Sequence, residues 1–173
     1  MIKTTFLLFI FAALCGCAAD FSNQALVRKG AVVATAYVHH NTIQEMKSLE
    51  VNCRKLDSVA KQDLWVGFPN GEHIRIAEIS LQLLEQHSAK KYSDKRSDNG
   101  ESCIFCVGGY SFRFENKSLV SFTVLTFGFP NNEREFPIVG SATAKSELSL
   151  PCSLPEFIKI FGQPDEIVRQ HGW

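Results

Sequence analysis

Tyr110-Ser111-Phe112-Arg113-Phe114-Glu115-Asn116-Lys117-Ser118-Leu119 is the stretch that decides the fold. Its first five residues alternate between aromatic and polar side chains, which is the two-residue period of a strand with one buried face. Polar residues 115–118 favour a turn, and residues 119–129 run back as a long apolar strand. The stretch therefore predicts a β-hairpin at the centre of an antiparallel sheet.

Further strands are predicted upstream of this hairpin. The run of valine and alanine at 31–38 is either a strand or the start of a buried helix, and we favour the strand. Residues 64–68 and 73–76 flank the turn sequence Pro69-Asn70-Gly71 and predict a second hairpin. The polar stretch 88–102 is interpreted as a solvent-exposed loop.

Helices are predicted at three places. Thr42-Ile43-Gln44-Glu45 has the form of a capping box, in which the Thr and Glu side chains bond to exposed amides at a helix start. Apolar residues then recur at spacings of three and four, at Ile43, Met46, Leu49, Cys53 and Leu56. Residues 82–91 and 155–161 are further candidates. Together these patterns predict an α+β fold: an antiparallel sheet built of hairpins, with two to three helices packed on one face.

The two halves of the chain share a short sequence similarity. Phe68-Pro69 and Glu78-Ile79-Ser80-Leu81 are matched by Phe136-Pro137 and Glu147-Leu148-Ser149-Leu150, and a helix candidate follows each copy. This indicates either an internal repeat of residues 68–91 in 136–161 or a chance similarity between strands.

The first residues form a leader with a positive charge at Lys3, an apolar core at 6–14 and the ending Leu14-Cys15-Gly16-Cys17. An apolar core of this length is too short for a transmembrane helix, which needs about 20 residues, and the layout is that of a secretory signal peptide. The ending resembles the lipobox of bacterial lipoproteins. That resemblance implies removal of residues 1–16 and lipidation of Cys17; the alternative is an ordinary signal peptide cut after Ala18 or Ala19.

The lipobox also divides the chain and places it in the cell. We expect residues 17–30 to form a lipidated tether, and residues 31–173 to form a single globular α+β domain. Lipoproteins retained in the inner membrane of enterobacterial-type cells carry Asp after the lipidated cysteine, where this chain has Ala18. The resemblance therefore implies a lipid anchor in the outer membrane, with the domain on the periplasmic face.

Four cysteines remain after this processing, at Cys53, Cys103, Cys106 and Cys152. An even number in an oxidising compartment favours two disulfides. If the Cys103–Cys106 segment is extended, its two sulfurs point to opposite faces, so bonds from it to Cys53 and Cys152 are favoured over a bond within it. A four-cysteine zinc site and a redox pair at Cys103 and Cys106 are the alternatives.

Charge and motifs exclude several classes of function. Lys and Arg together number 18, as do Asp and Glu, so no basic excess favours nucleic acid as a partner. The sequence has no Gly-x-Ser-x-Gly elbow, no His-Glu-x-x-His helix and no phosphate-binding glycine loop. His39 and His40 would point to opposite faces of a strand. We therefore expect no catalytic residue, no cofactor and no metal site.

One local pattern near the end of the sequence resembles known envelope proteins. The segment Phe161-Gly162-Gln163-Pro164-Asp165 ends a helix, with glycine as the C-cap and proline preventing its continuation. It resembles the helix-to-strand corner of small outer-membrane assembly lipoproteins and of the β-lactamase-inhibitor-protein module. The sequence as a whole favours non-enzymatic binding of a protein partner, as in an inhibitor or immunity protein. A structural or assembly lipoprotein, or a thiol-redox or zinc protein using Cys103 and Cys106, is the alternative.

Overall fold

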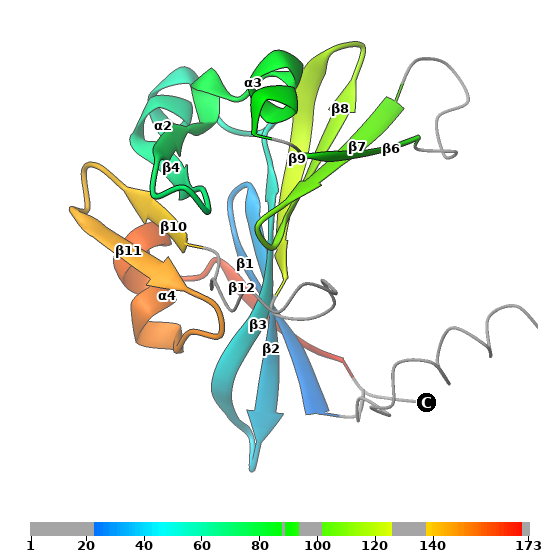
Figure 1. Ribbon diagram of the computed structural model, residues 1–173. Helices are drawn as coiled ribbons and strands as arrows, with labels where there is room; N and C mark the ends of the chain where they lie inside the picture. Colours follow the sequence, from blue (N-terminus) through cyan, green and yellow to red (C-terminus); the bar gives the residue numbers. More distant parts are fainter. Residues whose placement is uncertain (1–22, 88, 94–101, 126–137, 171–173) are drawn as a thin grey trace, which may run out of the picture.

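The computed structural model describes residues 23–87, 89–93, 102–125 and 138–170. Of these described residues, 54% lie in strands, and they form twelve strands in two antiparallel sheets with three short α-helices (Figure 1). The predicted α+β class is therefore wrong, because the protein is a β-rich fold. A second sheet, rather than a layer of helices, supplies most of the cover for the large sheet.

Eight strands form the larger sheet, in the order β12-β1-β2-β3-β9-β8-β7-β6. Their bounds are Gln24–Lys29 (β1), Val32–His39 (β2), Thr42–Asn52 (β3), Lys90–Ser93 (β6), Ser102–Val107 (β7), Tyr110–Glu115 (β8), Ser118–Leu125 (β9) and Glu166–Gln170 (β12). The predicted strand at 31–38 is confirmed as β2. The hairpin predicted at 110–129 is confirmed as β8 and β9, although residues 126–129 of the predicted second strand lie outside the described residues.

The smaller sheet has the order β11-β10-β4-β5. Its strands are Leu64–Gly67 (β4), His73–Arg75 (β5), Ile138–Ser141 (β10) and Ser146–Ser149 (β11), so the predicted hairpin at 64–76 is confirmed. The helices are Ser58–Asp63 (α2), Leu81–Gln86 (α3) and Leu154–Phe161 (α4), with a 3-10 turn, η2, at Ile76–Glu78. The predicted helix at 155–161 is confirmed, and the one at 82–91 is shorter than expected.

The predicted helix at 42–56 is wrong, because residues 42–52 form the long strand β3. His40 and Asn41 both have positive φ, at 45° and 65°, which is the two-residue turn of a tight hairpin and directs the chain back along β2. The pairing then shifts register, so that Met46 lies opposite Ala36 and Ser48 opposite Thr35, with one extra residue between them. This bulge lets Met46 and Leu49 both face the core at a three-residue spacing that imitates a helix.

Two loop predictions are also corrected. Residues 24–29 of the expected tether at 17–30 form β1, which pairs with both β12 and β2 and buries Ala25 and Val27 completely. Within the expected loop at 88–102, residues 90–93 form β6, which pairs with β7. Both segments are sheet strands because a neighbouring strand from a distant part of the chain satisfies their backbone groups.

The described chain follows the same path twice. Three antiparallel strands (β1-β2-β3) are followed by a hairpin, a helix and a strand (β4-β5-α3-β6), and the second half repeats this order as β7-β8-β9 and β10-β11-α4-β12. The last strand of each half pairs with the first strand of the other. Ser80 and Ser153 are the equivalent helix N-caps, so the predicted match of Ser80 to Ser149 has the wrong register; Phe136-Pro137 lies outside the described residues.

The core lies between the two sheets and is rich in aromatic residues. The larger sheet contributes Phe105, Phe112, Phe114 and Phe122, and the smaller sheet contributes valine, leucine and isoleucine side chains. Helices α3 and α4 each insert one fully buried residue, Leu84 and Phe157. The hydroxyl of Tyr110 joins the sheets: it donates to the carbonyl of Ile138 at 2.6 Å and accepts from the Ile138 amide at 2.7 Å.

Candidate functional site: the outer face of the large sheet

The four cysteines predicted to form disulfides are all free thiols in the structure. Cys53 donates its amide to the carbonyl of Val120 beside one end of β3, whereas Cys152 pairs with Met46 nearer the other end. Seven residues of strand separate these positions, which is roughly 20 Å at about 3.3 Å per residue. A disulfide needs Cα atoms within about 7 Å, so Cys53 and Cys152 cannot bridge.

Bonds from Cys53 to the cysteines of β7 are equally out of reach. Cys103 and Cys106 lie on β7, which is separated from β3 by β9 and β8. Three strand spacings amount to roughly 14 Å, twice the reach of a disulfide. Cys53 therefore reaches none of the other three cysteines, and the expected pair of disulfides is not present among these free thiols.

Burial raises the pKa of three of the four thiols. Burial raises the pKa of Cys53 to about 12, against the opposing charge of Lys61. Burial, together with the carboxylate of Glu156, raises the pKa of Cys152 to about 12. Burial also raises the pKa of Cys106, against a hydrogen bond with Ser111. A raised thiol pKa suppresses the thiolate, which is the nucleophilic and metal-binding form.

The histidines have separate structural neighbours. His39 and His40 do not point apart as predicted, since their ring centroids are 4.0 Å from each other at the β2–β3 turn. His73 stacks on Trp65 at 3.9 Å, and His87 lies 3.3 Å from a carboxylate oxygen of Glu72. His171 lies outside the described residues. Within the described ranges, no three His, Cys, Asp or Glu side chains are grouped so that they could hold a metal ion.

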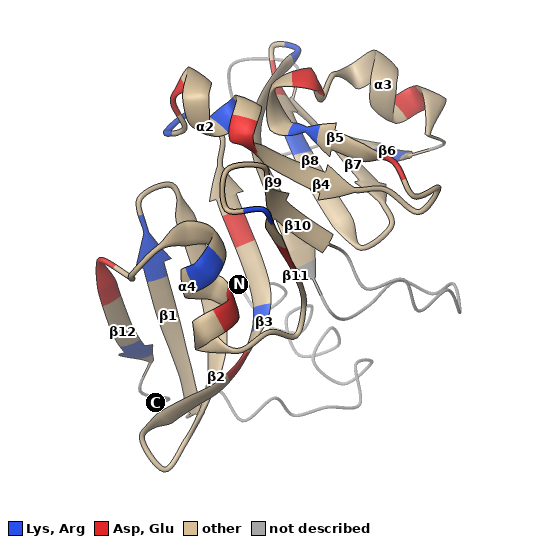
Figure 2. Cartoon of the chain, turned by 90° about the vertical axis from the view of Figure 1, so that its left-hand side faces the viewer, with Lys and Arg blue, Asp and Glu red and all other residues tan. Residues whose placement is uncertain are grey.

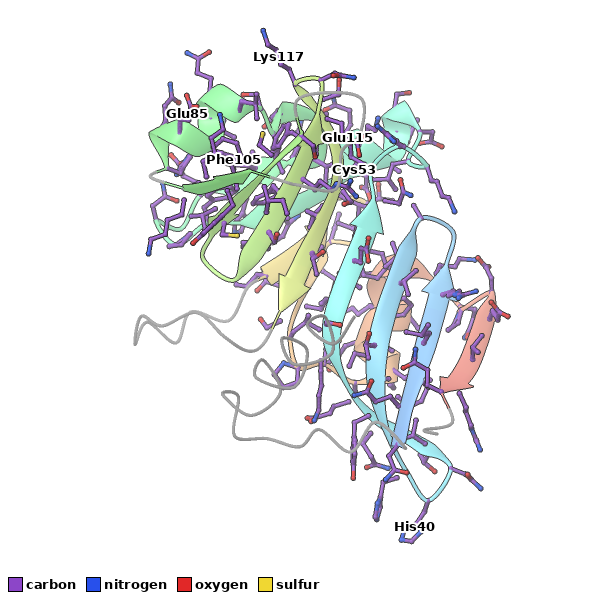
Figure 3. The ribbon with its side chains drawn as sticks, turned by 90° about the vertical axis from the view of Figure 1, so that its right-hand side faces the viewer. His40, Cys53, Glu85, Phe105, Glu115 and Lys117 are labelled. Atoms are coloured by element: carbon purple, nitrogen blue, oxygen red, sulfur yellow. The ribbon has the colours of Figure 1, made fainter. Side chains whose placement is uncertain are left out.

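The feature best suited to a function is the outer face of the large sheet, which we define as the side turned away from the small sheet. Because side chains alternate along a strand, the neighbours of the buried core residues point to this side. The register places Glu50, Thr123, Ser111 and Cys106 in one row across β3, β9, β8 and β7. Figure 3 shows this face, and no described helix lies on it.

The middle of the outer face is small and polar. Thr35 and Ser48 face each other across β2 and β3, and Ser121 and Thr123 follow on β9. All four side chains are partly exposed. A patch of short hydroxyl side chains leaves the surface nearly flat, with hydrogen-bonding groups that can pair with a partner or with bridging water.

Larger and charged side chains surround this middle. Near the β8–β9 turn, Arg54 and Arg113 both form ion pairs with Glu115, the latter at 3.1 Å. Near the opposite end, the Lys47 ammonium lies 4.9 Å from the centre of the Tyr37 ring. Tyr92 on the edge strand β6 is 52% exposed. The outer face thus has a polar middle of hydroxyl side chains and Glu50, with tyrosine and arginine side chains around it, the residue types that most often anchor protein interfaces.

Comparison with known proteins adds no family to this geometry. No protein-family model, curated protein or solved structure shows significant similarity to the chain. None of the helices that the structure describes is long and apolar enough to cross a membrane.

Sequence reasoning identified few of these residues. The side of the sheet on which each residue lies depends on a register that bulges in β2–β3 and β8–β9 alter, and a local sequence pattern does not reveal that register. The alternation of Ser111 and Arg113 with Phe112 was the one signal that could have assigned side chains to this face.

Proposed function

We propose that the protein is a lipid-anchored lipoprotein of the bacterial outer membrane, facing the periplasm, that binds a protein partner without catalysing a reaction. The outer face of the large sheet is the proposed binding surface. The observation that carries this proposal is that α3, α4 and the small sheet all pack on the inner side, which leaves an extended face without a covering helix among the described residues. An inhibitor or immunity protein would use such a face.

The thiol chemistry supports binding over catalysis. Cys103 and Cys106, the candidate redox pair, lie on a strand rather than at a helix start, and Cys106 has a raised pKa. A catalytic thiol needs a lowered pKa, which helix N-termini and nearby positive charges provide. The four cysteines therefore favour a structural interpretation over the thiol-enzyme alternative.

The lipid anchor is tested with two neighbouring cysteines of the leader. In a bacterial host fed a clickable palmitate analogue, the wild-type chain and Cys15→Ser should be labelled, and Cys17→Ser should lose the label. Cys15→Ser is the matched control because it alters the same motif without removing the acceptor thiol. Labelling that persists in Cys17→Ser would reject the anchor, and no labelling of the wild type would favour the ordinary signal peptide.

The binding surface is tested by site-specific photo-cross-linking in cells. A photoreactive residue at Thr123 reports on the middle of the outer face, and one at Ser149, an exposed strand position on β11, serves as control. We expect one adduct of defined mass from Thr123 and none from Ser149. An adduct with a protein delivered by another cell favours an immunity role, and one with a resident envelope protein favours an assembly role. Equal smears from both positions would reject the surface.

A further inference from the structure

An open pocket of about 380 Å³ lies at one end of the large sheet, where β1 and β12 meet the β2–β3 turn. Its floor includes the buried side chain of Val38, and its polar lining comes from Asn23, Gln24, His40, Asn41, Arg169 and Gln170. In Figure 3, His40 marks this end of the molecule, and Lys117 marks the opposite end. The volume lies within the range of small-molecule sites, roughly 300–1,000 Å³.

The guanidinium of Arg169 is held in place by the turn. One terminal nitrogen donates to the side-chain oxygen of Asn41 at 2.7 Å, and the other donates to the Asn41 main-chain oxygen at 3.0 Å. Asn41 can present both oxygens to the same guanidinium because the turn holds it at a φ of 65°. These two bonds use two of the five guanidinium N–H groups, so the group is oriented but keeps further donors.

Arg169 has a different kind of partner from the other cations on β1 and β12. Arg28 pairs with Glu166 at 3.0 Å, and Lys29 pairs with Asp165 at 2.7 Å. Figure 2 shows the basic and acidic segments of β1 and β12 beside each other. The partner of Arg169, in contrast, is a neutral asparagine, and none of the described residues that line the pocket carries a carboxylate.

The lining therefore combines one fixed cation with side-chain amides and an imidazole, all of which can donate hydrogen bonds. Planar donors beside an uncompensated positive charge suit the oxygens of a phosphate group, to which arginine bonds in a directional, often bidentate, way. We infer that this pocket binds a phosphate-type oxyanion, carried either by a phospholipid headgroup or by a small soluble phosphate compound.

This inference goes beyond the proposed function and does not depend on the lipid anchor, because the described residues alone define the pocket. If Cys17 is lipidated, the two proposals support each other. Asn23 is six residues from Cys17, a distance of about 20 Å at most for an extended chain. The pocket would then lie within reach of the headgroups of the membrane to which the chain is anchored.

The test uses the full chain with Cys17→Ser, so that membrane binding through an anchor does not interfere. One arm titrates inorganic phosphate and glycerol phosphate by calorimetry. The other measures flotation with phosphatidylcholine vesicles that contain or lack phosphatidylglycerol. Arg169→Gln removes the cation, and Gln170→Glu places a negative charge in the pocket. Arg28→Gln is the control, since it removes an arginine from the adjacent strand that already has a carboxylate partner.

We expect saturable binding in at least one arm, weakened about tenfold or more by Arg169→Gln and by Gln170→Glu, and unchanged by Arg28→Gln. Binding of soluble phosphate identifies a soluble compound as the source, and binding to vesicles alone identifies a headgroup. Circular dichroism checks that each variant is folded, and Gln170→Glu keeps the test decisive if Arg169→Gln unfolds. No binding in either arm, or equal weakening by Arg28→Gln, would overturn the inference while leaving the partner-binding proposal intact.

Discussion

Tyr110→Phe tests whether the hydroxyl that joins the two sheets stabilises the fold. The Tyr110 side chain is fully buried, and its hydroxyl both donates to and accepts from the backbone of Ile138. Phenylalanine keeps the ring in the core but leaves two partly buried backbone groups of Ile138 without this partner. Each such group costs about 1–3 kcal/mol, so we expect the free energy of unfolding to fall by about 2–4 kcal/mol. That is a large fraction of the roughly 5–15 kcal/mol typical of a domain.

The measurement is urea denaturation of the wild type and the variant, followed by circular dichroism. Tyr37→Phe is the matched control, because Tyr37 is a partly exposed tyrosine on the outer face of the same sheet. We expect the free energy of unfolding of Tyr37→Phe to differ from that of the wild type by no more than about 0.5 kcal/mol. A loss below about 0.5 kcal/mol for Tyr110→Phe would show that water or a shifted β10 replaces the hydroxyl, and would refute the claim that it joins the sheets.

Three further predictions concern other parts of the core. Partial burial works to raise the pKa of Asp63, but hydrogen bonds from Ser141 and Thr143 outweigh it and hold the pKa below that of an ordinary aspartate. The ionised carboxylate therefore stabilises the fold at neutral pH, and Asp63→Asn should lower the melting temperature at pH 7 but much less near pH 2; an equal effect at both would contradict this. A Cβ on Gly140 would lie 2.1 Å from the Trp65 ring, so Gly140→Ala should cost about 1–3 kcal/mol and change tryptophan fluorescence, whereas Gly67→Ala, with its nearest atom at 3.4 Å, should do neither. Cys53, with a pKa of about 12, should resist iodoacetamide at pH 8 until the chain is denatured; rapid modification of the folded chain would be inconsistent with its burial.

Local patterns predicted the elements whose partners are close in sequence. The β8–β9 hairpin, the β4–β5 hairpin and the capped helix α4 were all identified, because turn residues and side-chain alternation act over a few positions. Ser153 and Glu156 form a true capping box at α4, with both reciprocal hydrogen bonds present. The same pattern at Thr42 is part of a strand, so the pattern alone does not distinguish the start of a helix from the start of a strand after a hairpin turn.

The elements that were missed depend on partners distant in sequence. β1 imitates a tether because residues 18–29 as a whole are mostly polar or small, yet β12 and β2 on either side of it make it a strand. β6 imitates a loop in the same way, since eight residues separate it from its partner β7. β3 imitated a helix because a bulge changed its two-residue period locally. These three errors explain why the predicted class was α+β.

The candidate sites were less predictable than the strands. Rows of the outer face join residues from β3, β9 and β8 whose order in the sheet is not their order in the sequence. The pocket pairs Asn41 with Arg169, which are 128 residues apart. Nothing in either local sequence indicates that the two side chains meet, because their contact requires β12 to lie beside β1.

The last strand of each half of the chain pairs with the first strand of the other half, and the pocket forms only where this pairing is made. The outer face is built largely from the three-stranded units β1-β2-β3 and β7-β8-β9, whose hairpins pair locally. The pocket also requires β12, the strand that follows α4, to pair with β1, since Arg169 and Gln170 come from β12. Local opening of β12, an edge strand with mostly exposed side chains, would abolish the pocket without disturbing the outer face. Hydrogen exchange should therefore be faster in β12 than in β8, and a phosphate compound that binds the pocket should slow exchange in β12 selectively.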